Sequence, residues 1–392
     1  TWAVDYVLLD EQDRILGDTY GYRDHRTDGM DAEVAKILPE TELYGKTGIQ
    51  KQIFNTVYQL MAVKQQTPEL LQQAKTLLML PDYFGFRLTG NKLSEYTNGS
   101  TTQLVNPDTF QWDKELIRKL GYPEDIFLPL QMPGTKVGQL LPEIQKEVGF
   151  DLEVVLCGSH DTASAVMAVP QTEGDGIYIS SGTWSLMGIE SLKPVITEDA
   201  AAANFTNEGG YDHRFRFLKN IMGLWMIQSV RHEYNDAYSF AQLCDMAEES
   251  KEFPSRVDVN DQSFLSPDSM VEAIRQYCHK TGQPVPESVG ELTSVVYRSL
   301  AQSYGETVRG LEKIAGKTYD SIHIIGGGSN AAYLNQLTAD ATGKTVYAGP
   351  GEATAIGNLL AQMIHAGDLA DLKSARKCVR ESFEIKTFAP AK

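Results

Sequence analysis

The feature that most constrains this chain is a run of three glycines between an apolar segment and a helical pattern. Residues 321–331 read SIHIIGGGSNA, so that Gly326, Gly327 and Gly328 follow directly on the apolar residues. One glycine would suffice for a tight turn, whereas three leave no side chain between the backbone and a ligand. A strand, a glycine turn and a helix in this order predict an α/β layer with a flat or anionic ligand against the turn.

The same stretch fits G-x-G-x-x-A, the fingerprint of dinucleotide-binding folds, so a dinucleotide oxidoreductase is one alternative. Against it, the strand predicted at 344–347 is followed by Ala348 and Gly349, with no acid to bind a ribose hydroxyl. Gly-Lys-Thr occurs three times, but never with a glycine five residues earlier, which excludes a Walker A loop. An ATP site in this chain would therefore not be a P-loop.

A second turn, at residues 158–162, places His160 beside Asp161 between an apolar run and a helix of small residues. Ser159, Asp161 and Thr162 are all common helix caps, so a plain helix start is one interpretation. The other is catalytic, because open α/β sheets bind ligands where a strand ends. Asp161 could then orient a substrate hydroxyl and accept its proton while that oxygen attacks phosphorus.

A third stretch, SSGT at residues 180–183, joins two short predicted strands. These residues suit an ordinary hairpin turn. They would also suit a short phosphate cradle, because Gly182 allows a close backbone approach and Ser181 and Thr183 can donate hydrogen bonds. Both interpretations stay open on these residues alone.

Three smaller features could contact a polyol. The charged loop at 22–29 follows a predicted strand, and Asn220 precedes a helix predicted at 223–234. A solvated loop and a helix cap are the ordinary interpretations of these two. Trp2 could stack on a sugar, although a core position is the more common one for tryptophan.

Length and composition narrow the class of protein. A chain of 392 residues exceeds most single domains, so we expect two. The net charge of −17 disfavours nucleic acid as a partner because an acidic surface repels phosphate backbones. No apolar run approaches the ~20 residues of a membrane helix, and the four scattered cysteines form no disulfide or zinc pattern. These observations favour a cytoplasmic enzyme with no membrane or nucleic-acid partner.

Together these motifs resemble the FGGY carbohydrate kinases, in which an aspartate turn, a Ser-Gly-Thr hairpin and a late glycine turn occur in this order. The resemblance extends from residue 1 to about 370 and is closest to the members that phosphorylate L-rhamnulose. The stretches that carry it are 1–5 (TWAVD), 22–24 (YRD), 80–84 (LPDYF), 95–98 (EYTN), 159–165 (SHDTASA), 180–188 (SSGTWSLMG), 207–210 (NEGG) and 219–225 (KNIMGLW).

The resemblance implies an α/β fold of two actin-like ATPase (ribonuclease H-like) domains with an interdomain cleft. Residues 1–172 would be the remainder of a sugar-binding domain that lacks its N-terminal strands, and 173–392 a nucleotide-binding domain whose last residues pack back toward the first. The γ-phosphate of ATP, with Mg²⁺, would pass to the 1-hydroxyl of L-rhamnulose. Asp161 would accept the proton. The sugar would be held by Ala3, His160, Asp161, Thr162 and Asn220, and the nucleotide by Thr183, Gln228 and Gly327.

The sequence departs from the family pattern in two places. The family begins with a D-x-G-x-x-S phosphate hairpin that this sequence does not contain, and Ala3 stands where the family usually has glycine. Two alternatives therefore stay beside the leading one: another FGGY ketose or polyol kinase, such as a fuculokinase or xylulokinase, and a non-catalytic sugar-binding fragment.

Overall fold

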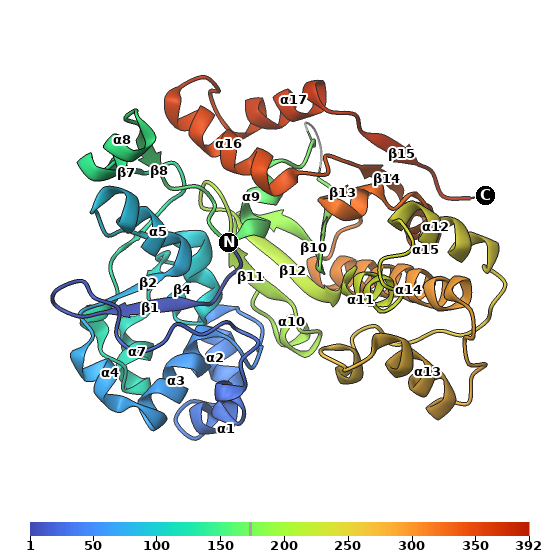
Figure 1. The fold of residues 1–392 in the computed structure, drawn as a ribbon, viewed down its shortest axis with the longest axis horizontal. Helices are drawn as coiled ribbons and strands as arrows, with labels where there is room; N and C mark the ends of the chain where they lie inside the picture. The colour runs from blue at the N-terminus through green and yellow to red at the C-terminus, as the bar shows by residue number, and fades with distance from the viewer. Residues whose placement is uncertain (172–174, 392) are drawn as a thin grey trace. The chain divides into compact units, whose positions relative to one another are not determined.

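The chain forms two compact units, each assembled from separate stretches of sequence. The computed structural model describes residues 1–171 and 175–391 (Figure 1). Unit 1 comprises Thr1–Met167, Glu190–Phe217 and Thr354–Ala375, and unit 2 comprises Ala168–Ile189, Leu218–Ala353 and Arg376–Lys392. The boundary predicted between residues 172 and 173 lies outside the described residues.

Unit 1 is mainly helical, with short paired strands. Strand β1 (Tyr6–Leu9) pairs with β2 (Thr76–Met79), β4 (Val105–Asn106) with β5 (Gln111–Trp112) and β7 (Lys136–Gln139) with β8 (Glu153–Val155), all antiparallel, while β3 (Ser94–Glu95) and β6 (Leu130–Gln131) are parallel. The helices are α1 (Met30–Ala35), α2 (Glu40–Thr47), α3 (Thr56–Gln66), α4 (Pro68–Gln73), α5 (Leu80–Thr89), α6 (Tyr96–Gly99), α7 (Lys114–Leu120), α8 (Pro142–Val148), α9 (Asp161–Met167), α10 (Glu198–Ala202) and α16 (Ala353–Ala366).

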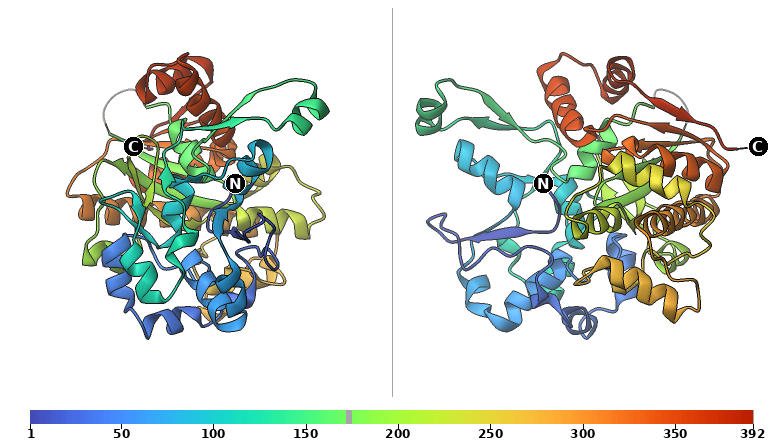
Figure 2. Two further views of the ribbon diagram at one scale, coloured as in Figure 1. Left: turned by 90° about the vertical axis from the view of Figure 1, so that its left-hand side faces the viewer. Right: turned by 45° about the vertical axis from the view of Figure 1, so that its right-hand side comes forward.

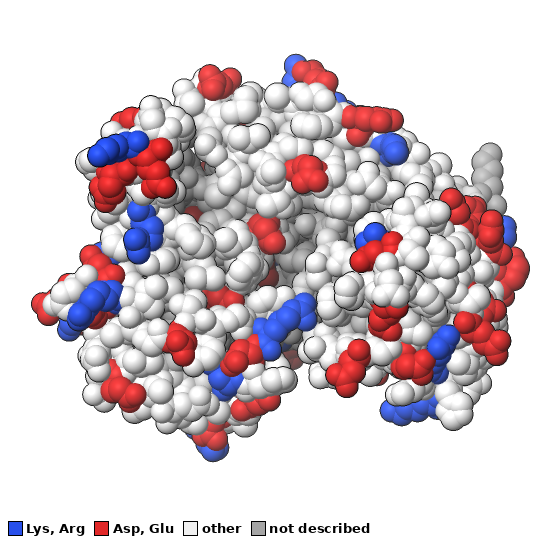
Figure 3. All heavy atoms as spheres, viewed as in Figure 1, with Lys and Arg blue, Asp and Glu red and all other residues white. Residues whose placement is uncertain are grey.

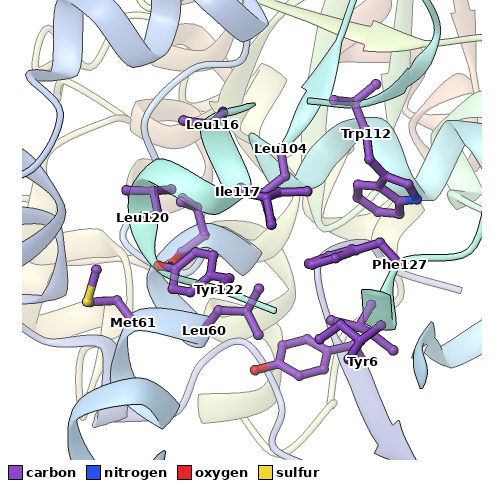
Figure 4. Close-up of a cluster of buried hydrophobic side chains, with 14 of the residues drawn as sticks. Tyr6, Leu60, Met61, Leu104, Trp112, Leu116, Ile117, Leu120, Tyr122 and Phe127 are labelled. Carbon is purple, nitrogen blue, oxygen red and sulfur yellow. The ribbon is translucent and has the colours of Figure 1, made fainter. Parts of the chain in front are cut away.

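The core of unit 1 shows how local sequence sets a helix and its buried face. Asp113 begins α7 by accepting a hydrogen bond from the backbone N of Leu116 at 2.9 Å, and Gly121 ends it in a left-handed conformation. Apolar residues at positions i, i+1 and i+4 of this helix, Leu116, Ile117 and Leu120, are fully buried. Figure 4 shows these three side chains in one cluster with residues of β1 and α3.

Unit 2 is built on a mixed sheet. Its strands are hydrogen-bonded in the order β12-β10-β9-β13-β14-β15. The central pairs, β9 with β13 and β13 with β14, are parallel, whereas β10 with β9 and β14 with β15 are antiparallel. The bounds are β9 (Ile177–Ser181), β10 (Trp184–Ser191), β12 (Phe215–Met222), β13 (Ser321–Ile325), β14 (Thr345–Ala348) and β15 (Lys386–Phe388). Strand β12 begins in unit 1, where β11 (Thr206–Gly209) pairs with it.

A long helix, α14 (Val289–Ala315), organises the helices of unit 2. Ser288 and Glu291 form a capping box at its start, and Gly316 ends it. It packs on α12 (Phe240–Glu249) and α15 (Ala332–Thr342), as Figure 2 shows. The remaining helices of unit 2 are α11 (Trp225–Glu233) and α13 (Met270–Lys280), while α17 (Leu372–Ser382) begins in unit 1 and ends in unit 2. Short 3₁₀ turns are η4 (Gln262–Phe264) and η5 (Gly327–Asn330) in unit 2, and η1 (His25–Thr27), η2 (Ser100–Thr102) and η3 (Glu124–Ile126) in unit 1.

Two sequence predictions near the start of the chain are wrong. Residues 3–9 have a strand-like pattern, but the strand begins at Tyr6 because Val4 has φ +68°, a left-handed conformation that interrupts an extended strand. Residues 14–21 predict a returning strand, which is absent. Only Ile15 bridges to Leu9, and Arg14 instead folds back on Asp10, to which its backbone N and Nε donate at 2.9 and 2.8 Å.

The surface charge, the cysteines and the helices are those expected from the composition. The face shown in Figure 3 carries acidic side chains over all its parts, with Lys and Arg among them, as a net charge of −17 requires. The four cysteines are free thiols. In the described part of the chain, no helix is both long enough and apolar enough to cross a membrane.

Candidate active site

Asp161 is the first residue of α9 and has two carboxylate oxygens in different environments. Oδ1 accepts hydrogen bonds from the backbone N of Thr162 at 2.7 Å and from its Oγ1 at 3.3 Å. Among the described residues, no hydrogen bond reaches Oδ2, and the side chain is 48% exposed. One oxygen is therefore held while the other stays available to a ligand, which is the arrangement a positioned proton acceptor needs.

A buried glutamate, Glu95, holds the turn that precedes Asp161. Glu95 is fully buried, and its Oε2 accepts hydrogen bonds from the backbone N and the Oγ of Ser159 at 3.1 and 2.5 Å. The same carboxylate accepts from Thr97 N, Thr97 Oγ1 and Asn98 N at 2.6, 2.6 and 3.0 Å. Glu95 thereby ties the start of α6 to the residue that precedes His160, so it fixes the backbone of the candidate site.

A second buried carboxylate, Asp82, lies beside Glu95. Its Oδ2 accepts a hydrogen bond from the backbone N of Glu95 at 3.1 Å. Burial, and then the neighbouring charge of Glu95, hold the pKa of Asp82 well above its usual range. Burial also raises the pKa of Glu95, although hydrogen bonds from Ser159 and Thr97 oppose the shift. The two acids are thus structural and are not exposed to a ligand.

His160 is held between Asp161 and a buried ion pair. Its Nε2 lies 3.4 Å from Oδ1 of Asp161, and its Nδ1 lies 3.2 Å from Oε2 of Glu208 and 3.0 Å from Nη2 of Arg216. Burial would raise the pKa of Glu208, but the positive charge of Arg216 opposes this shift, and the pKa lies below its usual value. An ionised Glu208 and a cationic Arg216 therefore contact the Nδ1 side of the His160 ring.

The first residues of the chain lie beside the same turn (Figure 1). The backbone N of Asp161 donates to the carbonyl O of Thr1 at 2.8 Å, and Thr1 N donates to Ser159 O at 2.9 Å. The amide of Ala3 donates no hydrogen bond to any described residue, so it is free to bind a ligand. The expected core position of Trp2 is wrong: it is 50% exposed, because its Nε1 is held by Asp5 at 2.6 Å.

The predicted sugar residues thus fall into two sets. The structure brings Ala3, His160, Asp161 and Thr162 together around one turn of unit 1. Asn220 lies in unit 2, where its Oδ1 is buried without a hydrogen-bond partner among the described residues. The charged loop at 22–29 is anchored by the backbone N of Tyr22, which donates to Asp5 at 3.0 Å.

In unit 2 the two predicted phosphate loops meet. A Cβ added to Gly326 would lie 2.9 Å from the carbonyl O of Ser181, and one added to Gly328 would lie 2.0 Å from Ser181 Oγ. Only glycines allow the triple-glycine turn to approach the hairpin this closely. Gly326 also has φ +81°, which favours glycine.

The glycine turn and the hairpin each have an exposed residue. Gly327 is exposed, and a Cβ added to it would meet no atom within 4 Å. Thr183 is exposed at the tip of the hairpin, and its carbonyl O accepts from Trp225 N at 3.1 Å, which attaches the start of α11. Gln228 lies one turn further along that helix and is half-buried. The glycine turn, the hairpin and the start of α11 therefore lie next to one another in unit 2.

No group of three or more His, Cys, Asp or Glu side chains among the described residues is arranged to hold a metal ion. This part of the chain therefore supplies no preformed acidic cluster for Mg²⁺.

Family models match both parts of the chain. The model described as the N-terminal domain of the FGGY family of carbohydrate kinases matches residues 1–168, and the C-terminal domain model matches residues 177–366. This chain belongs to the FGGY family. Its similar relatives include proteins named rhamnulokinase from Halalkalibacterium halodurans and Bacillus subtilis. The first is 52% identical over 100% of this chain and 83% of that protein, and the second is 46% identical over 100% and 80%.

Solved structures of other kinases share the fold. A xylulose kinase from Lactobacillus acidophilus has a TM-score of 0.80 at 17% identity, covering 100% of this chain and 79% of that one. A glycerol kinase from Plasmodium falciparum, with ADP, has a TM-score of 0.77 at 15% identity, covering 99% and 78%. The chain therefore has the α/β fold of two actin-like ATPase domains that the sequence resemblance implied.

Sequence reasoning missed three residues of this FGGY site: Glu95, Glu208 and Arg216. The first two lie within stretches that carried the family resemblance, but no role was given to them. One signal could have found them: each is a charged residue in a segment otherwise rich in small or apolar residues. A charged side chain that such a segment buries must have a partner.

Proposed function

We propose that this protein transfers the γ-phosphate of ATP to the 1-hydroxyl of L-rhamnulose, giving L-rhamnulose 1-phosphate and ADP. The observation that carries the proposal is the half-exposed Asp161, with one oxygen held and the other free, in a chain that is 41–52% identical to several proteins named rhamnulokinase. We further propose that it acts in the cytoplasm, in keeping with its free cysteines.

In the proposed reaction, Oδ2 of Asp161 accepts the proton of the sugar 1-hydroxyl. The oxygen of the sugar 1-hydroxyl forms a bond to the γ-phosphorus. The bond from this phosphorus to the β,γ-bridging oxygen breaks, which releases ADP. An ordinary carboxylate is a weak base toward an alcohol, but it can accept the proton late in a loose phosphoryl-transfer transition state. His160, Thr162, Asn220 and the amide of Ala3 would orient the sugar.

The nucleotide would lie against unit 2. The outer side of Gly327 is open to a flat or anionic group, and Thr183 and Gln228 would contact the nucleotide beside it. Mg²⁺ would reach the site with the ATP phosphates, since hydrated Mg²⁺ is commonly bound through phosphate oxygens and few protein ligands. It would supply charge neutralisation at those oxygens.

A substrate panel tests the proposal. ADP formation is measured with ATP, Mg²⁺ and, in turn, L-rhamnulose, L-fuculose, D-xylulose and glycerol. We expect the highest kcat/KM with L-rhamnulose. A higher value with another ketose would assign the chain to a neighbouring specificity, and sugar binding without ADP formation would show a non-catalytic protein. Binding of NAD(H) with no ATP turnover would instead support the oxidoreductase alternative.

Gly327→Ala tests the nucleotide surface. Because an added Cβ meets no atom within 4 Å, the variant should retain its free energy of unfolding. A methyl group at a surface packed against nucleotide should raise the KM for ATP about tenfold, as for overpacking of a close contact. The matched control is Gly45→Ala in α2, where a Cβ is equally free of contacts. An unchanged KM for ATP in Gly327→Ala would contradict the assigned surface.

A further inference from the structure

A fully buried arginine lies behind the His160 ring. Arg216 exposes none of its side chain, and its Nε donates to the carbonyl O of Gly209 at 2.9 Å. Its Nη2 lies 3.0 Å from Nδ1 of His160 and 3.1 Å from Oε2 of Glu208. Guanidinium nitrogens donate hydrogen bonds and never accept them. In a hydrogen bond between Nη2 and Nδ1, the ring nitrogen is therefore the acceptor.

The alignment of these atoms separates two possible arrangements of the ring proton. The contact between Nη2 of Arg216 and Nδ1 of His160 has hydrogen-bond geometry. The contact between Nδ1 and Oε2 of Glu208 is an ion-pair distance of 3.2 Å, and no donor among the described residues is aligned on Oε2. The geometry thus matches a ring whose Nδ1 carries a lone pair and not a proton.

We propose that Arg216 is a positioning residue that holds Nδ1 of His160 as an acceptor, so that the neutral ring carries its proton on Nε2. Glu208 balances the charge of Arg216 at 3.1 Å, which allows a guanidinium to stay buried beside a neutral ring. The catalytic meaning of this inference rests on the proposed kinase function, whereas the tautomer itself does not.

The consequence is a division of roles between two adjacent residues. Nε2 of His160 lies 3.4 Å from Oδ1 of Asp161, on the side where the sugar is proposed to bind. With its proton on Nε2 and its Nδ1 occupied, the ring can donate a hydrogen bond to a sugar oxygen but cannot take the sugar's proton. That proton is left to Asp161. In the other tautomer, Nε2 would carry a lone pair, and the hydrogen-bond donor to the sugar would be lost.

Nitrogen-15 NMR of the full chain labelled at histidine reads the tautomer directly. The chain has seven histidines, and the His160 signals are assigned as those missing from His160→Gln. We expect a pyridine-like shift for Nδ1 and a pyrrole-like shift for Nε2. Arg216→Lys keeps a positive charge beside Glu208 but loses the planar fork. It should increase the Nδ1-protonated form and lower kcat/KM for the sugar about ten- to hundredfold, as for one lost charge-assisted hydrogen bond.

The control is Arg118→Lys, an exposed arginine of α7 that lies 3.4 Å from Glu124 and should leave both readouts unchanged. A proton on Nδ1 in the unaltered protein would overturn the inference, even if the protein is an active kinase. An unchanged tautomer in a folded Arg216→Lys would also overturn it. If that variant does not fold, the spectrum of the unaltered protein still decides. A proton on Nε2 in a protein without kinase activity would refute only the proposed function.

Discussion

Asp161→Asn is expected to lower kcat about 10²- to 10⁴-fold, the usual contribution of a general base, while sugar binding stays nearly unchanged. The amide has almost the same shape, and its oxygen can still accept from Thr162 N, which holds Oδ1 at 2.7 Å in the carboxylate. What it loses is the second lone-pair oxygen, Oδ2, which is left without a partner among the described residues. The measurement pairs initial rates of ADP formation with calorimetric titration of the sugar.

The matched control for Asp161→Asn is Asp151→Asn, an exposed aspartate of the same unit. It changes the net charge equally and should leave kcat and sugar affinity unaltered. Retained turnover in Asp161→Asn would exclude this carboxylate as the proton acceptor. Loss of both turnover and sugar binding would show instead that Asp161 mainly holds the substrate.

Glu95→Ala is expected to lower the free energy of unfolding by about 3 kcal/mol or more, because several buried donors lose a charged acceptor at once. Those donors include the N and Oγ of Ser159, so the turn that carries His160 and Asp161 should lose its backbone position and its activity. Equilibrium urea unfolding measures the first effect and ADP formation the second. Glu115→Ala, at an exposed position in α7, is the control.

Glu95→Gln separates geometry from charge at this position. Burial raises the pKa of Glu95, so the folded state binds its proton more tightly than the unfolded chain does. The contribution of this group to stability is therefore greatest below the ordinary glutamate pKa of about 4.3 and declines as the pH rises through the raised value. In Glu95→Gln, the part of the decrease in unfolding free energy with rising pH that comes from Glu95 should disappear. The part that comes from the buried Asp82 should remain. A pH dependence of the unfolding free energy identical to that of the unaltered protein would contradict the assigned burial effect.

The elements that sequence predicts well are those specified by local chemistry. The apolar patterns predict a strand at 321–325 and helices at 290–315 and 353–366. The structure has the strand and the second helix with these limits, and the first helix is α14, with its capping residues in place. Each has a continuous apolar pattern bounded by glycine or cap residues. The glycine turn is also visible in the sequence, although its cause is tertiary, since the close approach to Ser181 admits no side chain at Gly328.

The parts that sequence did not predict depend on partners far away in the chain. Arg216 reads as an outward-facing residue of an alternating strand, yet it is buried because it meets His160, 56 residues away. Glu95 reads as an exposed helix start and is buried because Ser159, 64 residues away, donates to it. No local pattern specifies these pairs, because tertiary packing alone brings them together.

The central claim is tested most directly by identifying the atom that receives the phosphoryl group. The protein is incubated with ATP, Mg²⁺ and L-rhamnulose, and the product is examined by proton–phosphorus correlation NMR. We expect one new phosphate ester whose phosphorus correlates with the two protons on carbon 1, formed in equal amount with ADP. A phosphate on another carbon, or release of inorganic phosphate with the sugar unchanged, would contradict the account.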